Sequence, residues 1–90
     1  MRSNMVKGLN TDFYLDGKQY HLQTEDWGRQ NPYIVTRLYC QGAVVKTLKR
    51  SYIDIFGTVR ISSEVVQIAL KHQHEGFAKD FIVGRSNLQV

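Results

Sequence analysis

The sequence predicts an α+β fold in which two antiparallel β-hairpins form a four-stranded sheet, with a short helical turn and one long C-terminal helix packed on the sheet. Three patterns predict it. Residues 12–26 alternate between apolar and polar side chains around an Asp-Gly pair, and residues 32–50 place two arms rich in β-formers on either side of a Gln-Gly pair. Residues 63–83 then show apolar side chains at helical spacing. We therefore expect the sheet to occupy residues 12–50.

The first hairpin is centred on Asp16-Gly17, a strong turn signal because both central positions of a type I′ turn require positive φ. The polar residues 1–11 before it predict a loosely held terminus. Alternation divides the second arm into an apolar face with Tyr20, Leu22 and Thr24, and a wetter face with His21, Gln23 and Glu25.

A loop is predicted between the hairpins, because Gly28 and Asn31-Pro32 interrupt the pattern and proline cannot donate a ladder hydrogen bond. Trp27 lies in this loop. It either covers one end of the sheet or forms an exposed contact, and its large apolar area favours the cover.

The register of the second hairpin depends on the length of its connection. A three-residue connection with Gly42 in the left-handed conformation adds Val44 and Leu48 to the apolar face, whereas a two-residue connection adds Val45 and Thr47. We expect the longer connection, because its apolar face is more consistent. The first arm contributes to this face Ile34, Thr36, Leu38 and Cys40, and the opposite face is aromatic and basic, with Tyr33, Val35, Arg37, Tyr39, Val45, Thr47 and Lys49.

Two helical segments are expected after the strands. Ser51 caps a short turn over residues 51–57, and Gly57 closes it. A long helix follows over residues 63–83. Gly76, in its middle, costs about 1 kcal/mol relative to alanine and indicates a kink or a close approach to the sheet. The helix presents to the sheet the apolar stripe Val66, Ala69, Leu70, Phe77 and Phe81.

Length and composition predict one folded domain over residues 1–90. The 42% hydrophobic content is too high for intrinsic disorder, and no apolar run approaches the roughly 20 residues that span a bilayer. Since the first ten residues lack the apolar stretch of a secretory signal, we expect a cytoplasmic protein without membrane insertion. Cys40 is the only cysteine, so no intrachain disulfide forms, and its strand position indicates a small buried hydrophobe.

No pattern of catalytic or metal-binding residues is recognisable. His72 and His74 lie about 200° apart on a helix and cannot share one ion, so solvated or locally paired histidines are the simpler interpretation. His21 and Cys40 would form a dyad only if a strand pointing into the core left room for substrate. The glycines are isolated and make no phosphate loop. We expect no enzyme, no cofactor and no metal.

A non-enzymatic protein-interaction module remains, binding an unidentified partner protein through an aromatic and basic sheet face or an edge strand. One form of this interaction is a homodimer, which would form through the sheet edges or through a second apolar stripe of the helix. The net charge of +4 keeps an alternative open, in which the same face binds single-stranded nucleic acid or a nucleotide. The residues expected to bind the partner are Trp27, Tyr33, Arg37, Tyr39, Lys46 and Lys49.

The run Tyr20 to Asp26, with later residues up to Tyr52, resembles a small bacterial domain family of the form YHxQTEDxG…NPxIxT…G…KxSY. The resemblance covers residues 12–55, leaves the helix unmatched and implies no activity. It draws attention to polar residues that either lock the loop through hydrogen bonds, the favoured interpretation, or bind a partner. They are Gln23, Thr24, Glu25, Asp26, Asn31 and Ser51.

Overall fold

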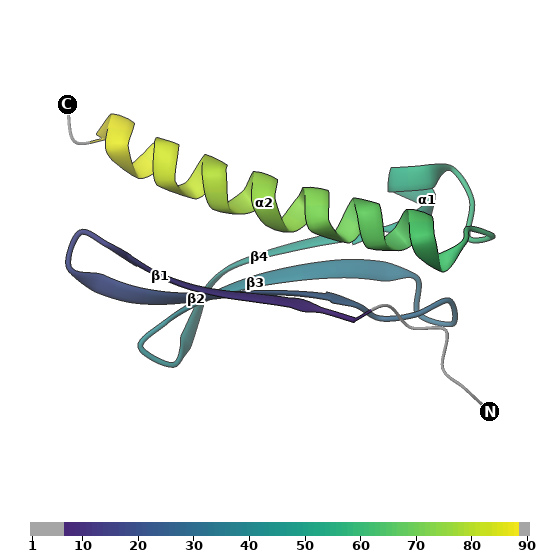
Figure 1. Ribbon diagram of the computed structural model, residues 1–90, viewed down its shortest axis with the longest axis horizontal. Coiled ribbons are helices and arrows are strands. Elements are labelled where there is room, and N and C mark those ends of the chain that lie inside the picture. Colours follow the sequence, from purple (N-terminus) through teal and green to yellow (C-terminus); the bar gives the residue numbers. More distant parts are fainter. Residues whose placement is uncertain (1–6, 89–90) are drawn as a thin grey trace.

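The computed structural model describes residues 7–88 and confirms the predicted α+β fold (Figure 1). All strands pair antiparallel with their sequence neighbours, in the order β1-β2-β3-β4. Both helices lie on the same side of the sheet, so the other face has no helix over it (Figure 1). The elements are β1 (Leu9–Leu15), β2 (Lys18–Asp26), β3 (Tyr33–Cys40), β4 (Ala43–Ser51), α1 (Tyr52–Phe56) and α2 (Ser63–Leu88).

The first hairpin turns at Asp16 and Gly17, whose φ angles of 55° and 77° are both positive, as a type I′ turn requires. β1 begins earlier than predicted, because Leu9 pairs with Thr24 and packs against the core. The expected loose terminus over residues 1–11 is therefore wrong for residues 9–11. Residues 1–6 lie outside the described part of the chain.

The second hairpin corrects the predicted three-residue connection. Gln41 and Gly42 form a two-residue turn with φ angles of 55° and 83°. The pairing then shifts between Leu38 and Tyr39, so that Val45 is an extra residue in a β-bulge. Simple alternation cannot include this extra residue. The bulge places Leu48 on the predicted apolar face, opposite Thr36. Val44, however, lies on the other face of the sheet, with its partner Tyr39.

The helices follow their sequence signals with one change in length. The Ser51 hydroxyl accepts a 3.0 Å hydrogen bond from the amide of Asp54, and Gly57 closes α1 with a φ of 78°. α2 continues to Leu88 rather than ending at residue 83, because Gly84 remains helical instead of adopting the left-handed conformation of a C-terminal cap.

The core consists of two apolar clusters between α2 and the sheet. One contains Ile34, Tyr52, Val66 and Leu70, and the other contains Tyr20, Leu22 and Leu38 with Phe77 and Phe81 packed against them. The expected helix stripe thus faces the sheet. Within residues 7–88, neither helix combines the length and hydropathy needed to cross a bilayer.

Gly76 does not serve one of the two roles predicted for it. Outside its own stretch of helix, a Cβ atom at this position would meet no heavy atom within 4 Å, so the glycine does not serve a close approach to the sheet. Open space lies beside α2 at this point instead. It belongs to the groove described next.

Candidate functional site: a groove between the edge strand and the long helix

The edge strand β4 extends beyond the cover of α2. The helix packs mainly on β2, with β1 and β3 as its other principal neighbours in the sheet. Apart from Leu48 and Ser51, which are partly covered, every residue of β4 is exposed. The helix-facing row of this strand therefore lacks the layer that covers the rest of that face.

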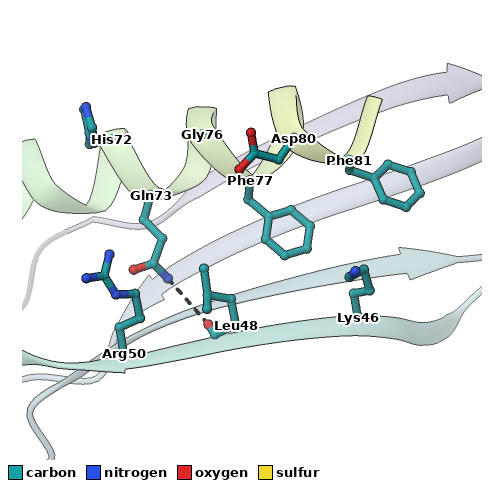
Figure 2. A pocket seen from close by; sticks show the side chains of 9 residues that line it. All are labelled: Lys46, Leu48, Arg50, His72, Gln73, Gly76, Phe77, Asp80 and Phe81. Carbon is teal, nitrogen blue, oxygen red and sulfur yellow. Dashed lines mark hydrogen bonds between the residues drawn. The ribbon is translucent and has the colours of Figure 1, made fainter. Parts of the chain in front are cut away.

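A groove of about 410 Å³ separates this row from α2 (Figure 2). Figure 2 shows Arg50, Leu48 and Lys46 spaced along β4, with Gln73 and Phe77 directed from the helix toward the sheet. Beyond Lys46 the groove continues into a second cavity of about 650 Å³. The first cavity is completed by His72, Gly76, Asp80 and Phe81, and the second by Lys18, Tyr20, Cys40, Val45, Asp80, Phe81 and Gly84.

The groove is basic. Three cations line its two cavities, Lys18, Lys46 and Arg50, and the one carboxylate among the described lining residues is Asp80. Among the side chains that the structure describes, residues 7–84, those of Lys46 and Arg50 make no hydrogen bond or ion pair. Two unpaired cations at an uncovered strand favour a negatively charged occupant.

Gln73 forms the inner wall of the groove and is only 7% exposed. Its side-chain amide donates to the Thr36 hydroxyl at 3.0 Å and to the Ile34 carbonyl at 3.2 Å. A longer contact of 3.4 Å reaches the Leu48 carbonyl (Figure 2). Among buried side-chain atoms of the described residues, only its Oε1 lacks a partner. A buried acceptor without a donor is unfavourable. This atom is fully buried, so it is not accessible from the groove.

His74, the next residue, lies in a polar layer between the two apolar clusters. Its Nδ1 is 2.8 Å from the Thr24 hydroxyl, and its Nε2 is 2.9 Å from that of Thr11. Thr24 also lies 2.8 Å from the Thr36 hydroxyl. Burial lowers the pKa of His74, His21 lowers it further, and Glu75 opposes the shift. Burial thus favours the neutral form of the imidazole.

Gln73 and His74 were missed as buried groups, since the sequence interpretation treated His74 as solvated or locally paired. A signal was present. His74 follows Leu70 by four residues and precedes Phe77 by three, so it shares their helical stripe. Thr24 and Thr36 likewise fall on the apolar faces of their strands, where a polar partner from the helix has to meet them.

Most of the predicted partner-binding residues lie on the opposite, uncovered face of the sheet. Arg37 and Lys49 lie 5.6 and 5.0 Å from the centre of the Trp27 ring, and Lys49 lies 4.3 Å from that of Tyr33. Val35 shares this face and is only 2% exposed, although no helix covers it. Trp27 and its cations thus form a small cover of their own, which we call the Trp27 cluster: Trp27, Tyr33, Arg37 and Lys49.

The other two predicted partner-binding residues lie apart from the Trp27 cluster. Tyr39 contacts His21, with ring centres 6.0 Å apart. Lys46 pairs with Leu38 and lies on the helix-facing side, in the groove. The structure therefore divides the predicted surface between two faces.

The predicted polar cluster is divided in the same way. On the helix side, Asp26 accepts hydrogen bonds from the Tyr52 hydroxyl at 2.5 Å and the Gly28 amide at 3.1 Å. Burial, followed by this contact with Asp26, raises the pKa of the Tyr52 hydroxyl. Asp26 thus ties the loop to α1.

The remaining members of that set have partners of their own. Gln23 donates to Glu25 at 2.6 Å on the uncovered face, and Thr24 belongs to the polar layer. The Ser51 hydroxyl caps α1. Asn31 contributes through its backbone, since its amide donates to the Gly28 carbonyl at 3.1 Å.

The candidate reactive residues lie on different faces of the molecule. His21 points to the uncovered face, where Asp12 is 2.6 Å from its Nδ1, whereas Cys40 pairs with Tyr20 on the helix side. His72 lines the rim of the groove and is directed away from β4 (Figure 2). His21 and Cys40 therefore form no dyad. No group of three metal-ligating side chains occurs in the portion of the chain that is described.

We compared the chain with protein-family models, with curated proteins and with solved structures, and none of the three comparisons found a match. The resemblance of residues 12–55 to a small bacterial domain family therefore stays a prediction.

Proposed function

We propose that this protein is a non-enzymatic interaction module that binds an extended segment of a partner protein along β4. The segment would add a fifth strand to the sheet, and its alternate side chains would enter the groove. The observation that carries the proposal is the uncovered row Lys46, Leu48 and Arg50 beside the open space at Gly76.

An edge strand suits this role because its outer N–H and C=O groups have no neighbour in the sheet. In strand addition, main-chain hydrogen bonds supply affinity and pockets for alternate side chains supply specificity. A fifth strand would lie about 4.8 Å beyond β4, and every second side chain of it would point to the side of the sheet on which α2 lies. Those side chains would extend over β4 toward the groove.

A simpler interpretation is that the lysines of β4 only discourage edge-to-edge aggregation. That interpretation explains Lys46 and Lys49. It does not explain why α2 retains a glycine where a larger residue would fit. Strand binding accounts for the open space beside that glycine.

Selection of peptides tests the proposal and does not require that the partner be identified first. The full chain is used to select from a library of random extended peptides, and the enriched peptides are titrated against Gly76→Trp and Ile68→Trp. Gly76 lines the groove, so a tryptophan there should obstruct it, whereas Ile68 is 68% exposed and does not line the groove. We expect binding to be lost only in Gly76→Trp. Equal binding to both variants, or no enriched peptide, would overturn the proposal.

A second candidate is single-stranded nucleic acid binding by the uncovered face, favoured by the joint presence of Trp27, Tyr33, Arg37 and Lys49 there. The cations already lie over the aromatic rings, so a base would have to displace them. Anisotropy of a labelled oligonucleotide tests it. Binding that persists at physiological salt and is lost in Arg37→Ala with Lys49→Ala would support it, and binding that disappears with salt would exclude it.

A further inference from the structure

We infer that the strand bound at β4 carries an acidic, an apolar and an acidic residue at alternate positions, in the pattern acid–x–apolar–x–acid. This inference rests on the proposed function. It adds the chemical identity of the partner segment, which the groove specifies through the three side chains that β4 presents to it.

The spacing of those three side chains sets the pattern. Lys46, Leu48 and Arg50 follow one another at every second position, so their side chains repeat about every 6.6 Å along the strand. A paired strand has the same repeat, and residues directly opposite have Cβ atoms about 4.5–5.5 Å apart. Each groove-facing residue of the partner therefore meets one member of this row.

Charge determines the outer two positions. Neither Lys46 nor Arg50 has an ionic partner among the side chains of residues 7–84, and an acid opposite each would supply one. The apolar position follows from Leu48, the one partly buried member of the row, and from Phe77 above it. A charged residue there would lose hydration without gaining a partner.

The two ends of the row are not equivalent. Asp80 lines both cavities where they meet at Lys46, whereas no carboxylate lines the Arg50 end among the described residues. An acid near Lys46 would also experience repulsion from Asp80. Arginine can bind a carboxylate through two parallel hydrogen bonds. The acid opposite Arg50 should therefore contribute more to affinity than the acid opposite Lys46.

A second copy of this chain fits the site less well. Residues 43–51 of β4 contain three cations and no acid, so two such strands side by side would bring like charges together. The sequence of the strand thus favours an acidic partner over itself. Self-association is one outcome that the experiment below can detect.

The test compares three labelled peptides that differ only at the outer positions: Glu-Thr-Val-Thr-Glu, Gln-Thr-Val-Thr-Gln and Lys-Thr-Val-Thr-Lys, each with the same Thr-Val flanks. Each is titrated against the full chain by fluorescence anisotropy. We expect the Glu peptide to bind about tenfold or more tightly than the Gln peptide, and the Lys peptide to bind most weakly.

The complementary experiment reverses the charges on the protein and uses the same three peptides. Lys46→Glu with Arg50→Glu should reverse the preference toward the Lys peptide, and Arg50→Glu alone should weaken binding of the Glu peptide more than Lys46→Glu alone. The control, Lys71→Glu with Lys79→Glu, makes the same change in net charge at exposed helix positions outside the groove. It should leave the order of the three peptides unchanged.

The outcomes separate this inference from the proposed function. Equal binding of the Glu and Gln peptides, lost in Gly76→Trp, would overturn the charge pattern and leave strand binding intact. Failure of all three peptides and of any selected peptide would overturn both. Concentration-dependent self-association that is lost in Gly76→Trp would identify a second copy as the occupant and would also overturn the inference.

Discussion

The Tyr52 hydroxyl donates a 2.5 Å hydrogen bond to Oδ1 of Asp26, and this bond joins the first residue of α1 to the last residue of β2. Both residues are buried, at 3% exposed each. Tyr52→Phe should therefore destabilise the protein by about 1–3 kcal/mol, because a buried carboxylate loses a donor. Urea denaturation measures the change. Tyr14→Phe, at a position 73% exposed, should have almost no effect, and equal effects of both substitutions would contradict this role of Asp26.

His74 predicts a dependence of stability on mildly acidic pH. Its folded-state pKa is lowered, chiefly by burial, so its contribution is fully present above the unfolded-state pKa of about 6.5 and is lost as pH falls toward the folded-state pKa. The free energy of unfolding should fall by up to about 1.4 kcal/mol per pH unit below pH 6.5. Denaturation at a series of pH values between about 7.5 and 5 measures the slope.

Two variants, His74→Gln and His72→Gln, test whether His74 causes this slope of the free energy of unfolding against pH. His74→Gln should flatten the slope whatever its effect on absolute stability, because the titrating group is removed from the polar layer. His72→Gln should leave the slope as it is, since His72 is exposed. An unchanged slope in His74→Gln would show that another group causes the pH dependence.

The open space at Gly76 predicts a stabilising substitution. Gly76→Ala should raise the free energy of unfolding by about 0.5–1 kcal/mol, because alanine favours the helix and its Cβ meets no atom within 4 Å. Gly57→Ala is the control, and it should destabilise because Gly57 has a φ of 78°. A loss of stability in Gly76→Ala would mean that the helix requires glycine there for a packing reason.

The Trp27 cluster should show measurable coupling between its members. A double-mutant cycle of Trp27→Leu and Lys49→Met should give a coupling energy of about 0.5–1 kcal/mol, as expected for a cation near an aromatic ring at a partly exposed site. The same cycle with Lys46→Met should give none, because Lys46 lies on the other face of the sheet. Equal coupling in the two cycles would contradict the placement of these side chains.

Local signals in the sequence were sufficient for most of the fold. Asp16-Gly17 specified the first turn, and Ser51 with Gly57 delimited α1, because turn and cap residues act within a few positions of themselves. The bulge at Val45 was not predictable in this way. It depends on how the rest of β4 aligns with β3, and a two-residue turn followed by a bulge keeps Leu48 facing the helix just as a longer turn would.

The candidate site was less predictable than the fold. Alternation along the strands correctly placed Tyr33, Arg37 and Lys49 on one face. The groove itself depends on the lateral position of α2 over the sheet, which follows from the packing of residues far apart in the chain, such as Leu22 and Phe77. Gly76 was the one local signal for the groove in the sequence, and only the structure showed that open space lies beside it.

The central claim is that a partner segment pairs with the main chain of β4. The most direct measurement is backbone amide hydrogen exchange by NMR on the full chain, free and with a bound peptide. We predict that the outward-facing, alternate amides of Ala43–Ser51 exchange rapidly in the free protein and become protected on binding. Methylation of every second peptide nitrogen should remove this protection only when the methylated nitrogens are the ones that face β4. Binding with unchanged exchange along β4 would contradict the account.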